Sequence, residues 1–433
     1  MSNIKFVRQW QTGNYDARLL TKRVRFAITF QSHKDMTIKR ALALLMLTLL
    51  PPLSLPLSAD EENDYRLYLL TVDPGVEIYS IYGHSALRLV NESQNYDQVF
   101  NWGVFDFSTP NFAYRFIKGR LDYMLIAYSY NRFLAEYTFE ERDVHSQEIF
   151  LTADELEKLI ELVEENLKPE NVKYRYDFFY DNCATRIRDI LVDATAGRIS
   201  LERAEEETLP TFRDLLSIYQ SNMRWLDLGI DMLLGMPADK RADESDQMFL
   251  PDYLMYNLTS ATILREGVEM PLLSKPTTVL RFESSATRTP LLLSPGIILS
   301  ALLVLTLLIS VSKRLKGVRA PFDLTITGLF SLLALLIWFV TFFTDHDATG
   351  HNLNTIWANP LIILSFIALF IRKSSPAIHR INLSVITIFL VAAPFLPQAF
   401  NPSMLPLVLI LLVRLWFLGE TGIWLKRRRS LAV

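Results

Sequence analysis

The chain has 433 residues, half of them hydrophobic and 21% charged, and its 44 Lys and Arg residues nearly balance its 47 Asp and Glu residues. This near-neutral charge gives no support to nucleic-acid binding. Cys183 is the single cysteine, so the chain has no internal disulfide and its thiol is free. A chain of this length and hydrophobicity is typical of a water-soluble domain followed by membrane spans.

The first 59 residues have the pattern of a processed leader rather than of a domain. Residues 1–35 are polar and lack a clear periodicity, whereas Met36 opens a basic stretch followed by an apolar run over residues 41–50. A small-residue end at Ala59 completes the pattern of a secretory signal peptide. The apolar run is too short for a comfortable span. We therefore predict that Met36 is the true start and that residues 1–35 are an upstream extension.

Residues 60–200 predict an α+β domain. Alternating and β-branched patterns predict strands over 65–72, 84–90, 98–105 and 146–151. Thr152 and Glu155 form a capping box before a helix that ends near residue 167. A second helix follows Asp181 or Asn182 as its N-cap and carries an apolar face made of Ile187, Ile190, Leu191 and Ala194. Residues 201–290 predict a helical extension and linker, with an extended segment after Pro271.

Residues 291–433 predict a transmembrane domain of about five helices. The apolar runs cover about 292–311, 324–343, 356–371, 381–399 and 403–419. The third is short and holds Asn359 and Pro360, which predict either a kink or a partly re-entrant segment. Lys and Arg occur in the first and third connections and at the C-terminus, but not in the second and fourth. The positive-inside rule places the basic connections in the cytoplasm and the domain before residue 291 outside it. Arg414, within the fifth run, is either a functional intramembrane charge or a side chain that snorkels to the surface.

Three residues form the candidate catalytic site. The N-terminal position of Cys183 on its predicted helix favours a thiolate, because backbone N–H groups and the helix dipole point at the sulfur. His84 opens a predicted strand after Gly83 and is the candidate base, which would take the thiol proton and leave an ion pair. Asn101, on the next predicted strand, is the candidate residue that orients the imidazole. The alternative is that Cys183 is a small buried core residue, His84 bonds only to the backbone and Asn101 is a turn residue.

The motifs around these residues resemble those of the Lnb-type proteins. They are Tyr82-Gly83-His84-Ser85-Ala86-Leu87-Arg88, Phe100-Asn101-Trp102-Gly103-Val104-Phe105-Asp106-Phe107, Pro110-Asn111-Phe112, and Tyr176-Asp177-Phe178-Phe179-Tyr180-Asp181-Asn182-Cys183-Ala184-Thr185-Arg186. Phe343 to His346 and Trp357 to Pro360 extend the resemblance into the membrane part. It covers most of the chain after about residue 65. These bacterial membrane proteins have a periplasmic thiol domain, and their founding members are lipoprotein N-acyltransferases.

The resemblance implies a fold and a reaction. The fold is a permuted papain-like thiol domain, similar to the lecithin:retinol acyltransferase group in having His before Cys, with a C-terminal α-helical transmembrane bundle. The reaction moves a fatty acyl chain from a phospholipid to Cys183 and then to the N-terminal amine of a bacterial lipoprotein. Such chemistry needs no cofactor and no metal. Tyr180 or Asn182 would help the Cys183 N–H to stabilise the oxyanion. The implied location is the inner membrane, multi-pass, with the catalytic domain in the periplasm.

The connection over residues 344–354 lies on the same side of the membrane as the thiol domain. It carries His346, Asp347 and His351, and three interpretations of it stay open: a lipid or substrate loop, a metal site, or a plain polar connection. The function has alternatives too. A papain-like hydrolase would act on phospholipid or on cell-wall peptide, with water as acceptor, and a non-catalytic envelope protein would use Cys183 and His84 only structurally.

Overall fold

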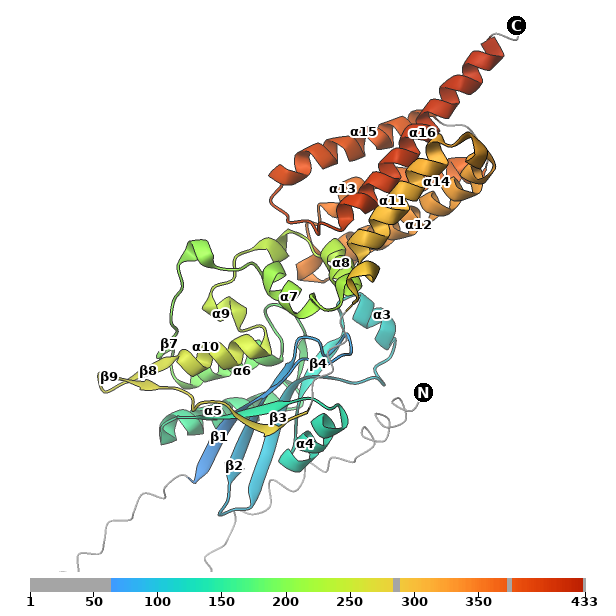
Figure 1. The fold of residues 1–433 in the computed structure, drawn as a ribbon. Coiled ribbons are helices and arrows are strands. Elements are labelled where there is room, and N and C mark those ends of the chain that lie inside the picture. The colour runs from blue at the N-terminus through green and yellow to red at the C-terminus, as the bar shows by residue number, and fades with distance from the viewer. Residues whose placement is uncertain (1–63, 283–288, 372–375, 431–433) are drawn as a thin grey trace, which may run out of the picture. The chain divides into compact units, whose positions relative to one another are not determined.

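The structure is a computed structural model that describes residues 64–282, 289–371 and 376–430, and these residues belong to one compact unit (Figure 1). The predicted signal peptide and the predicted start at Met36 lie outside the described residues. The described chain is mixed α+β: an antiparallel sheet with helices comes first, and a region of apolar helices follows. The predicted fold class is confirmed at this level.

A seven-stranded antiparallel sheet, in the order β10-β5-β1-β2-β3-β4-β6, forms the framework of the first domain. Its strands are β1 (Tyr65–Val72), β2 (His84–Asn91), β3 (Tyr96–Phe105), β4 (Asp122–Ser129), β5 (Val144–Ile149), β6 (Lys173–Arg175) and β10 (Thr277–Leu280). The central strands carry apolar side chains on both faces of the sheet, because alternate residues point into two different hydrophobic cores. Leu67, Leu87 and Phe100 face one core, whereas Leu70, Ala86 and Val99 face the other.

Helices cover both faces of this sheet (Figure 1). Helices α5 (Ala153–Leu167) and α6 (Cys183–Ala194) pack on the first face, and α4 (Tyr130–Phe139) packs on the second. The predicted capping box at Thr152 and Glu155 is present, and Ile187, Leu191 and Ala194 are buried as the predicted apolar face of α6 requires. The sequence did not resolve α3 (Phe112–Ile117), β4 and α4, because aromatic residues occur on all their faces.

The segment that links the sheet to the apolar helices contains more than helices. Helices α7 (Phe212–Gln220), α8 (Arg224–Leu233), α9 (Glu244–Gln247) and α10 (Pro251–Ser260) follow one another, with the short 3₁₀ helices η1 (Glu206–Thr208) and η2 (Met236–Asp239) between them. A second small sheet, β7-β8-β9, also forms here, from β7 (Ile199–Ser200), β8 (Thr262–Arg265) and β9 (Val268–Pro271). The extended segment predicted after Pro271 contains β10, which adds an edge strand to the large sheet.

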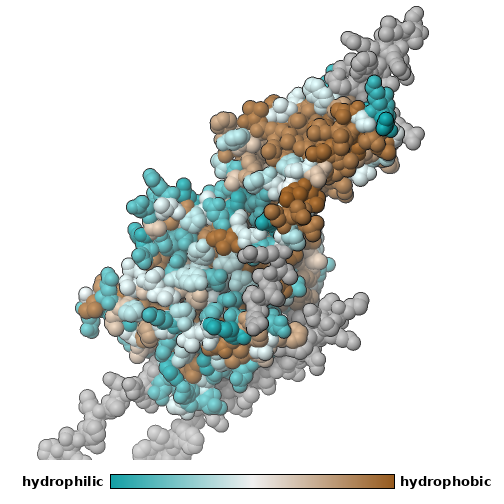
Figure 2. Space-filling view, viewed as in Figure 1, coloured by the Kyte–Doolittle hydropathy of each residue, from teal (hydrophilic) through white to brown (hydrophobic). Residues whose placement is uncertain are grey.

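The C-terminal region is a set of apolar helices, and Figure 2 shows hydrophobic surface over them. They are α11 (Pro295–Val311), α12 (Lys316–Phe343), α13 (Asn354–Trp357), α14 (Leu361–Phe370), α15 (Pro376–Ala392) and α16 (Met404–Ser430), with η3 (Leu291–Leu293), η4 (Lys313–Leu315), η5 (Asp347–Thr349) and η6 (Ala393–Phe395). By length and composition, Lys313–Phe343 and Pro376–Phe395 are long enough to cross a membrane, and Pro295–Val311, Asn354–Phe370 and Met404–Gly419 are shorter. The predicted kink is present, since α13 ends before Asn359-Pro360 and α14 begins after it.

Arg414 is not a snorkelling side chain. It is 2% exposed, and its Nε donates to Asp323 Oδ1 across 2.6 Å, while Nη1 donates to Ser310 Oγ. Asp323 is also buried, so the pair joins α16, α12 and α11 inside the apolar bundle. A charge is tolerated in such a place when an opposite charge and further hydrogen bonds satisfy it. The sequence could not reveal this partner, 91 residues away.

Candidate functional site

Cys183 is the first residue of α6, as the sequence predicts, and Asn182 is the N-cap. The Asn182 side chain accepts hydrogen bonds from the N–H groups of Ala184 and Thr185, and Thr185 completes a capping box by accepting from the Asn182 N–H. Asn182 is preferred at N-caps because its short side chain reaches these otherwise unpaired donors. The cap therefore fixes the direction of the first helical turn and with it the position of the sulfur.

Asn182 and Tyr180, the two residues predicted to help stabilise an oxyanion, differ in burial. The Asn182 amide nitrogen donates to the carbonyls of Phe178 and Phe249, so this buried side chain is occupied at both ends. Tyr180 is 43% exposed, and its ring packs against Phe179 and Phe212. Both residues shape the turn before α6. Their predicted roles as oxyanion donors stay predictions.

The surroundings of the Cys183 thiol include two groups that the sequence did not single out. Burial raises the pKa of the thiol, whereas the backbone N–H groups of Ser85, Ala184 and Cys183 itself act in the opposite direction. Gly103 has a φ of +86°, and a Cβ built on it would lie 3.5 Å from the Cys183 Cβ and 4.0 Å from the Tyr174 hydroxyl. Gly103 thus leaves a small space between the thiol and Tyr174, which a side chain would fill.

The Tyr174 hydroxyl is buried; the Gly103 backbone N–H acts on its oxygen, and among the described residues no group accepts its proton. Burial raises the pKa of Tyr174 first, and the charge of Cys183 adds to this increase. Arg186 stacks over the same ring, with its guanidinium carbon 3.9 Å from the centroid. A buried hydroxyl whose proton has no acceptor is unusual in a folded protein and marks a position where another group is expected.

His84 and Asn101 are in direct contact, as predicted. His84 Nε2 lies 2.6 Å from Asn101 Oδ1. The Asn101 amide nitrogen donates to the Tyr128 hydroxyl at 2.8 Å, and that hydroxyl donates to the Glu136 carboxylate at 3.3 Å. These hydrogen bonds assign the tautomer of His84. The Asn101 amide nitrogen is used by Tyr128, so its oxygen faces His84; Nε2 therefore carries the ring proton, and Nδ1 keeps its lone pair.

The imidazole is uncharged at neutral pH in this setting. Burial lowers the pKa of His84 to about 4, and the nearby charge of Arg142 contributes in the same direction, while Asn101 opposes both. Arg142 is itself buried and donates to the Asp73 carbonyl and to Glu140. The same guanidinium acts on Cys183, where it lowers the pKa of the thiol. His84, Cys183 and Arg142 therefore share one electrostatic environment.

The three predicted catalytic residues come to one end of the sheet, but His84 and Cys183 reach it from opposite faces. His84 bonds Asn101 directly, and both side chains lie on the α4 side, where His84 also stacks on Tyr137 with ring centroids 6.4 Å apart. Cys183 comes from α6 on the other side and approaches β2 at the N–H of Ser85, the residue after His84. The pairing of the thiol with the imidazole stays a prediction.

The loop over residues 344–354 lies beside the segment that carries Cys183. The charge of Asp347 acts on Asp177 and Tyr180, whose pKa values are raised mainly by burial. His346 contacts Gly119, with its ring 3.1 Å from a Cβ built there, and its Nε2 lies 3.2 Å from the Ile117 carbonyl. The loop is thus attached to the thiol domain. The roles predicted for His346, Asp347 and His351 stay predictions.

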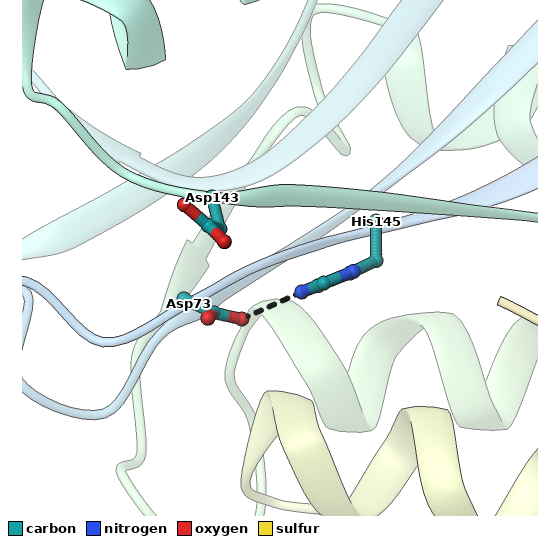
Figure 3. Close-up of side chains that lie close together, drawn as sticks. All are labelled: Asp73, Asp143 and His145. Atoms are coloured by element: carbon teal, nitrogen blue, oxygen red, sulfur yellow. Dashed lines mark hydrogen bonds and ion pairs between the residues drawn. The ribbon is translucent and has the colours of Figure 1, made fainter. Parts of the chain in front are cut away.

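Asp73, Asp143 and His145 form a different cluster near the end of β1 and the start of β5 (Figure 3). One potential ligand atom of each lies within 4.8 Å of the others. His145 Nε2 lies 3.0 Å from Asp73 Oδ1, and its Nδ1 lies 3.1 Å from the Thr278 hydroxyl. Because both ring nitrogens already have partners, the cluster fits a set of hydrogen bonds that holds β1, β5 and β10 together better than it fits a metal site.

These features define a class: a membrane protein whose N-terminal domain has a cysteine at a helix N-terminus and a histidine oriented by Asn101 on the sheet that this helix covers. Comparison with family models gives two matches. Residues 58–218 match the Lnb N-terminal periplasmic domain, and residues 285–421 match the Lnb transmembrane domain. The chain belongs to the Lnb family, as its motifs indicate. Comparisons with curated proteins and with solved structures gave no match.

Proposed function

We propose that the protein is a membrane-bound thiol acyltransferase that uses Cys183 as nucleophile and His84 as base. The observation that carries this proposal is the ordered chain from Glu136 through Tyr128 and Asn101 to His84, which leaves the Nδ1 lone pair free at the sheet end that Cys183 approaches. Nucleophilic thiol catalysis needs an oriented imidazole and a positioned thiol, and both components are present at this end of the sheet.

The electrostatics favour a neutral pair at rest over an ion pair. Burial raises the pKa of Cys183 and lowers the pKa of His84, so each group is held in its uncharged form. Proton transfer from sulfur to Nδ1 then accompanies the attack on the substrate. Hydrogen bonds of catalytic residues are often long without substrate and shorten in the reacting complex, and we expect this for Cys183 and His84.

Tyr174 is our first choice for an additional oxyanion donor. The proton of its buried hydroxyl has no acceptor among the described residues, and the hydroxyl lies beside the space that Gly103 keeps open next to the thiol. Removing one oxyanion donor typically lowers kcat by about a hundredfold to a thousandfold. We expect a loss of about this size for Tyr174→Phe, with an unchanged thermal midpoint. A lower midpoint with an unchanged kcat would instead make the hydroxyl structural.

The first half-reaction forms a thioester. The Cys183 sulfur attacks the ester carbonyl of a phospholipid, and its proton passes to His84 Nδ1. The tetrahedral intermediate then collapses with cleavage of the ester C–O bond, and the leaving alcohol of the lysophospholipid takes the proton back from the imidazolium. No metal or soluble cofactor enters this step.

The second half-reaction transfers the acyl chain to an amine. The uncharged α-amine at the lipidated N-terminus of a bacterial lipoprotein attacks the thioester carbonyl and gives a proton to His84. The C–S bond then breaks, and the imidazolium returns the proton to the departing Cys183 sulfur. The partners are thus a phospholipid donor and a lipoprotein acceptor. The location is the bacterial inner membrane, with about five spans, the permuted papain-like thiol domain in the periplasm and donor lipids within reach.

A transfer assay tests this function. The full chain is reconstituted in phosphatidylethanolamine vesicles with labelled acyl chains, together with a synthetic diacylated lipopeptide. We expect label on the lipopeptide amine with the unaltered chain and none with Cys183→Ala or His84→Ala. His145→Ala is the matched control, because both ring nitrogens of that histidine bond elsewhere.

Two outcomes would contradict the proposal. Release of labelled free fatty acid without label on the lipopeptide would make the protein a phospholipid hydrolase, the second candidate. Unchanged transfer in Cys183→Ala would exclude the thiol mechanism.

The partial burial of Cys183 favours the transferase, because a shielded thioester is less open to water than to an acceptor held at the site.

A further inference from the structure

Helix α3 carries large apolar side chains, although none of its residues is buried in the domain. It has six residues, none is buried, and its N-cap Asn111 provides no side-chain cap. Tyr114, Phe116 and Ile117 are each more than half exposed, and so is Phe107 just before the helix. A water-soluble domain rarely presents several large apolar side chains together, and such patches mark contact with a membrane or a partner.

A continuous row of aromatic rings leads from this exposed helix toward Cys183. The ring of Phe116 stacks on Phe112 at 6.2 Å, and Phe112 lies 5.7 Å from Phe105. Phe105 packs at 5.3 Å against Tyr123, which in turn stacks on Tyr176 at 4.3 Å. The row therefore passes from the surface into the domain through rings that are each in contact with the next.

The inner end of the row packs on the same hydrophobic core as the thiol. Tyr176 and Cys183 pack against the same hydrophobic core. Burial raises the pKa of Tyr176, and after burial the charge of Cys183 is the next contribution. An apolar chain lying along the row would thus end at the core on which the nucleophile packs.

The outer end of the row meets the apolar helices. Lys118 directly follows α3, its Nζ donates to the Phe343 carbonyl at the end of α12, and it lies 5.7 Å from the centroid of the Phe339 ring. Phe339 and Phe343 line an apolar groove of about 360 Å³, together with Leu335, Trp338, Pro360 and Ile363. This groove is on α12 and α14, so the surrounding lipid is the molecule that meets it first.

Cations surround the outer end. Arg115, Lys118, Arg120 and Arg175 lie here, against the carboxylates of Asp122 and Asp345. Four positive and two negative charges leave an excess of two positive charges. Exposed guanidinium groups beside an apolar path fit a phosphate whose hydrocarbon chains continue into the path.

We propose that α3 and the row Phe116, Phe112, Phe105, Tyr123 and Tyr176 form the path along which one acyl chain of a membrane phospholipid reaches Cys183. The groove on α12 and α14 receives the chain from the bilayer, and the phosphate stays with the surrounding cations. This inference rests on the proposed function, since it describes how the donor reaches the thiol.

The kinetic test uses the exposed end of the row, where a substitution does not disturb the core. Phe116→Asp places a charge in the path, and Phe116→Leu keeps the path apolar. Tyr256→Asp is the matched control, because Tyr256 is a similarly exposed aromatic residue, on α10. Two donors are compared in full-length protein: a long-chain phosphatidylethanolamine in vesicles and p-nitrophenyl acetate, whose acyl group needs no apolar path.

We expect Phe116→Asp to slow acylation by the phospholipid at least about tenfold, the loss that corresponds to one buried aromatic contact. Its reaction with p-nitrophenyl acetate should stay within about twofold of the unaltered chain, and Phe116→Leu and Tyr256→Asp should retain both reactions. Unchanged acylation by the phospholipid in Phe116→Asp overturns the inference, as does an equal loss in Tyr256→Asp.

A second measurement separates the path from the chemistry. Cys183→Ala protein, which forms no thioester, is placed in vesicles of phosphatidylethanolamine that carries a diazirine on one acyl chain, and is irradiated. Adducts in the peptides that contain Phe105, Phe112 and Tyr123 support the path even when the unaltered chain transfers no acyl group. Adducts confined to the apolar helices after Pro295, or cross-links between two copies of the chain at α3, contradict it.

Discussion

The charge state of Cys183 is open to a direct measurement, because it is the only cysteine in 433 residues. Alkylation of the full-length protein by iodoacetamide therefore reports one thiol without mutagenesis. The rate follows the fraction of thiolate, since the thiolate is the reactive form. Burial holds the pKa of this thiol above its ordinary value of 9.0. At pH 7 the thiolate is then about 1% of the total or less.

The expected profile follows from this value. Between about pH 6 and pH 8.5 the alkylation rate should rise about tenfold for each pH unit, without a plateau. Alkylation is measured by mass spectrometry of the intact protein in detergent micelles, and Cys183→Ala sets the background. A rate that is nearly constant from about pH 5 to pH 8 would show a preformed thiolate–imidazolium pair and would refute the neutral resting state.

Three further outcomes follow from individual contacts. Asn101→Ala should lower kcat for acyl transfer by about tenfold to a hundredfold with a normal thermal midpoint, because the imidazole loses the acceptor that orients it; an unchanged kcat would contradict this. Arg414→Ala should lower the free energy of unfolding by about 3–5 kcal/mol, because Asp323 is left buried and unpaired. The double variant Arg414→Met with Asp323→Leu should recover most of this loss. Equal thermal midpoints in the single and the double variant would contradict this expectation. The Asp73 hydrogen bond raises the pKa of His145 in the folded state, so its contribution to stability is present below about pH 6.5 and is lost as the pH rises through the folded-state pKa. The difference in thermal midpoint between the unaltered chain and His145→Asn should therefore shrink from about pH 6 to about pH 9, and a growing difference would contradict this.

Local patterns carried much of the sequence-based prediction. β1, β2, α5 and α6 follow from alternation, helical periodicity and caps, all of which act over a few residues. The hairpin of β8 and β9 was missed because its turn is Glu266-Gly267, with both residues at positive φ. Asn-Gly or Asp-Gly is the usual signal for such a turn, and Glu in the first position is a weak one.

Some residues of the site could be predicted from the sequence, and others reach the site only through tertiary packing. His84 and Asn101 were predicted as partners because their residue types and their adjacent strands point to each other, and the 2.6 Å contact agrees with that. Tyr174 and Tyr128 were not singled out. Their hydroxyl groups reach the site only through the register of β4 and β6 and through the packing of α6 on the sheet. Tertiary packing of this kind leaves no periodic trace in the sequence.

The proposed reaction passes through one covalent intermediate, the Cys183 thioester, and one measurement tests it. The full-length protein is incubated with phosphatidylethanolamine vesicles without an acceptor, and its intact mass is determined before and after treatment with hydroxylamine. We predict a mass increase of one acyl chain on the unaltered chain, its loss with hydroxylamine, and no increase in Cys183→Ala. An unaltered mass with intact phospholipid present, or an adduct that persists in Cys183→Ala, would contradict the thioester mechanism.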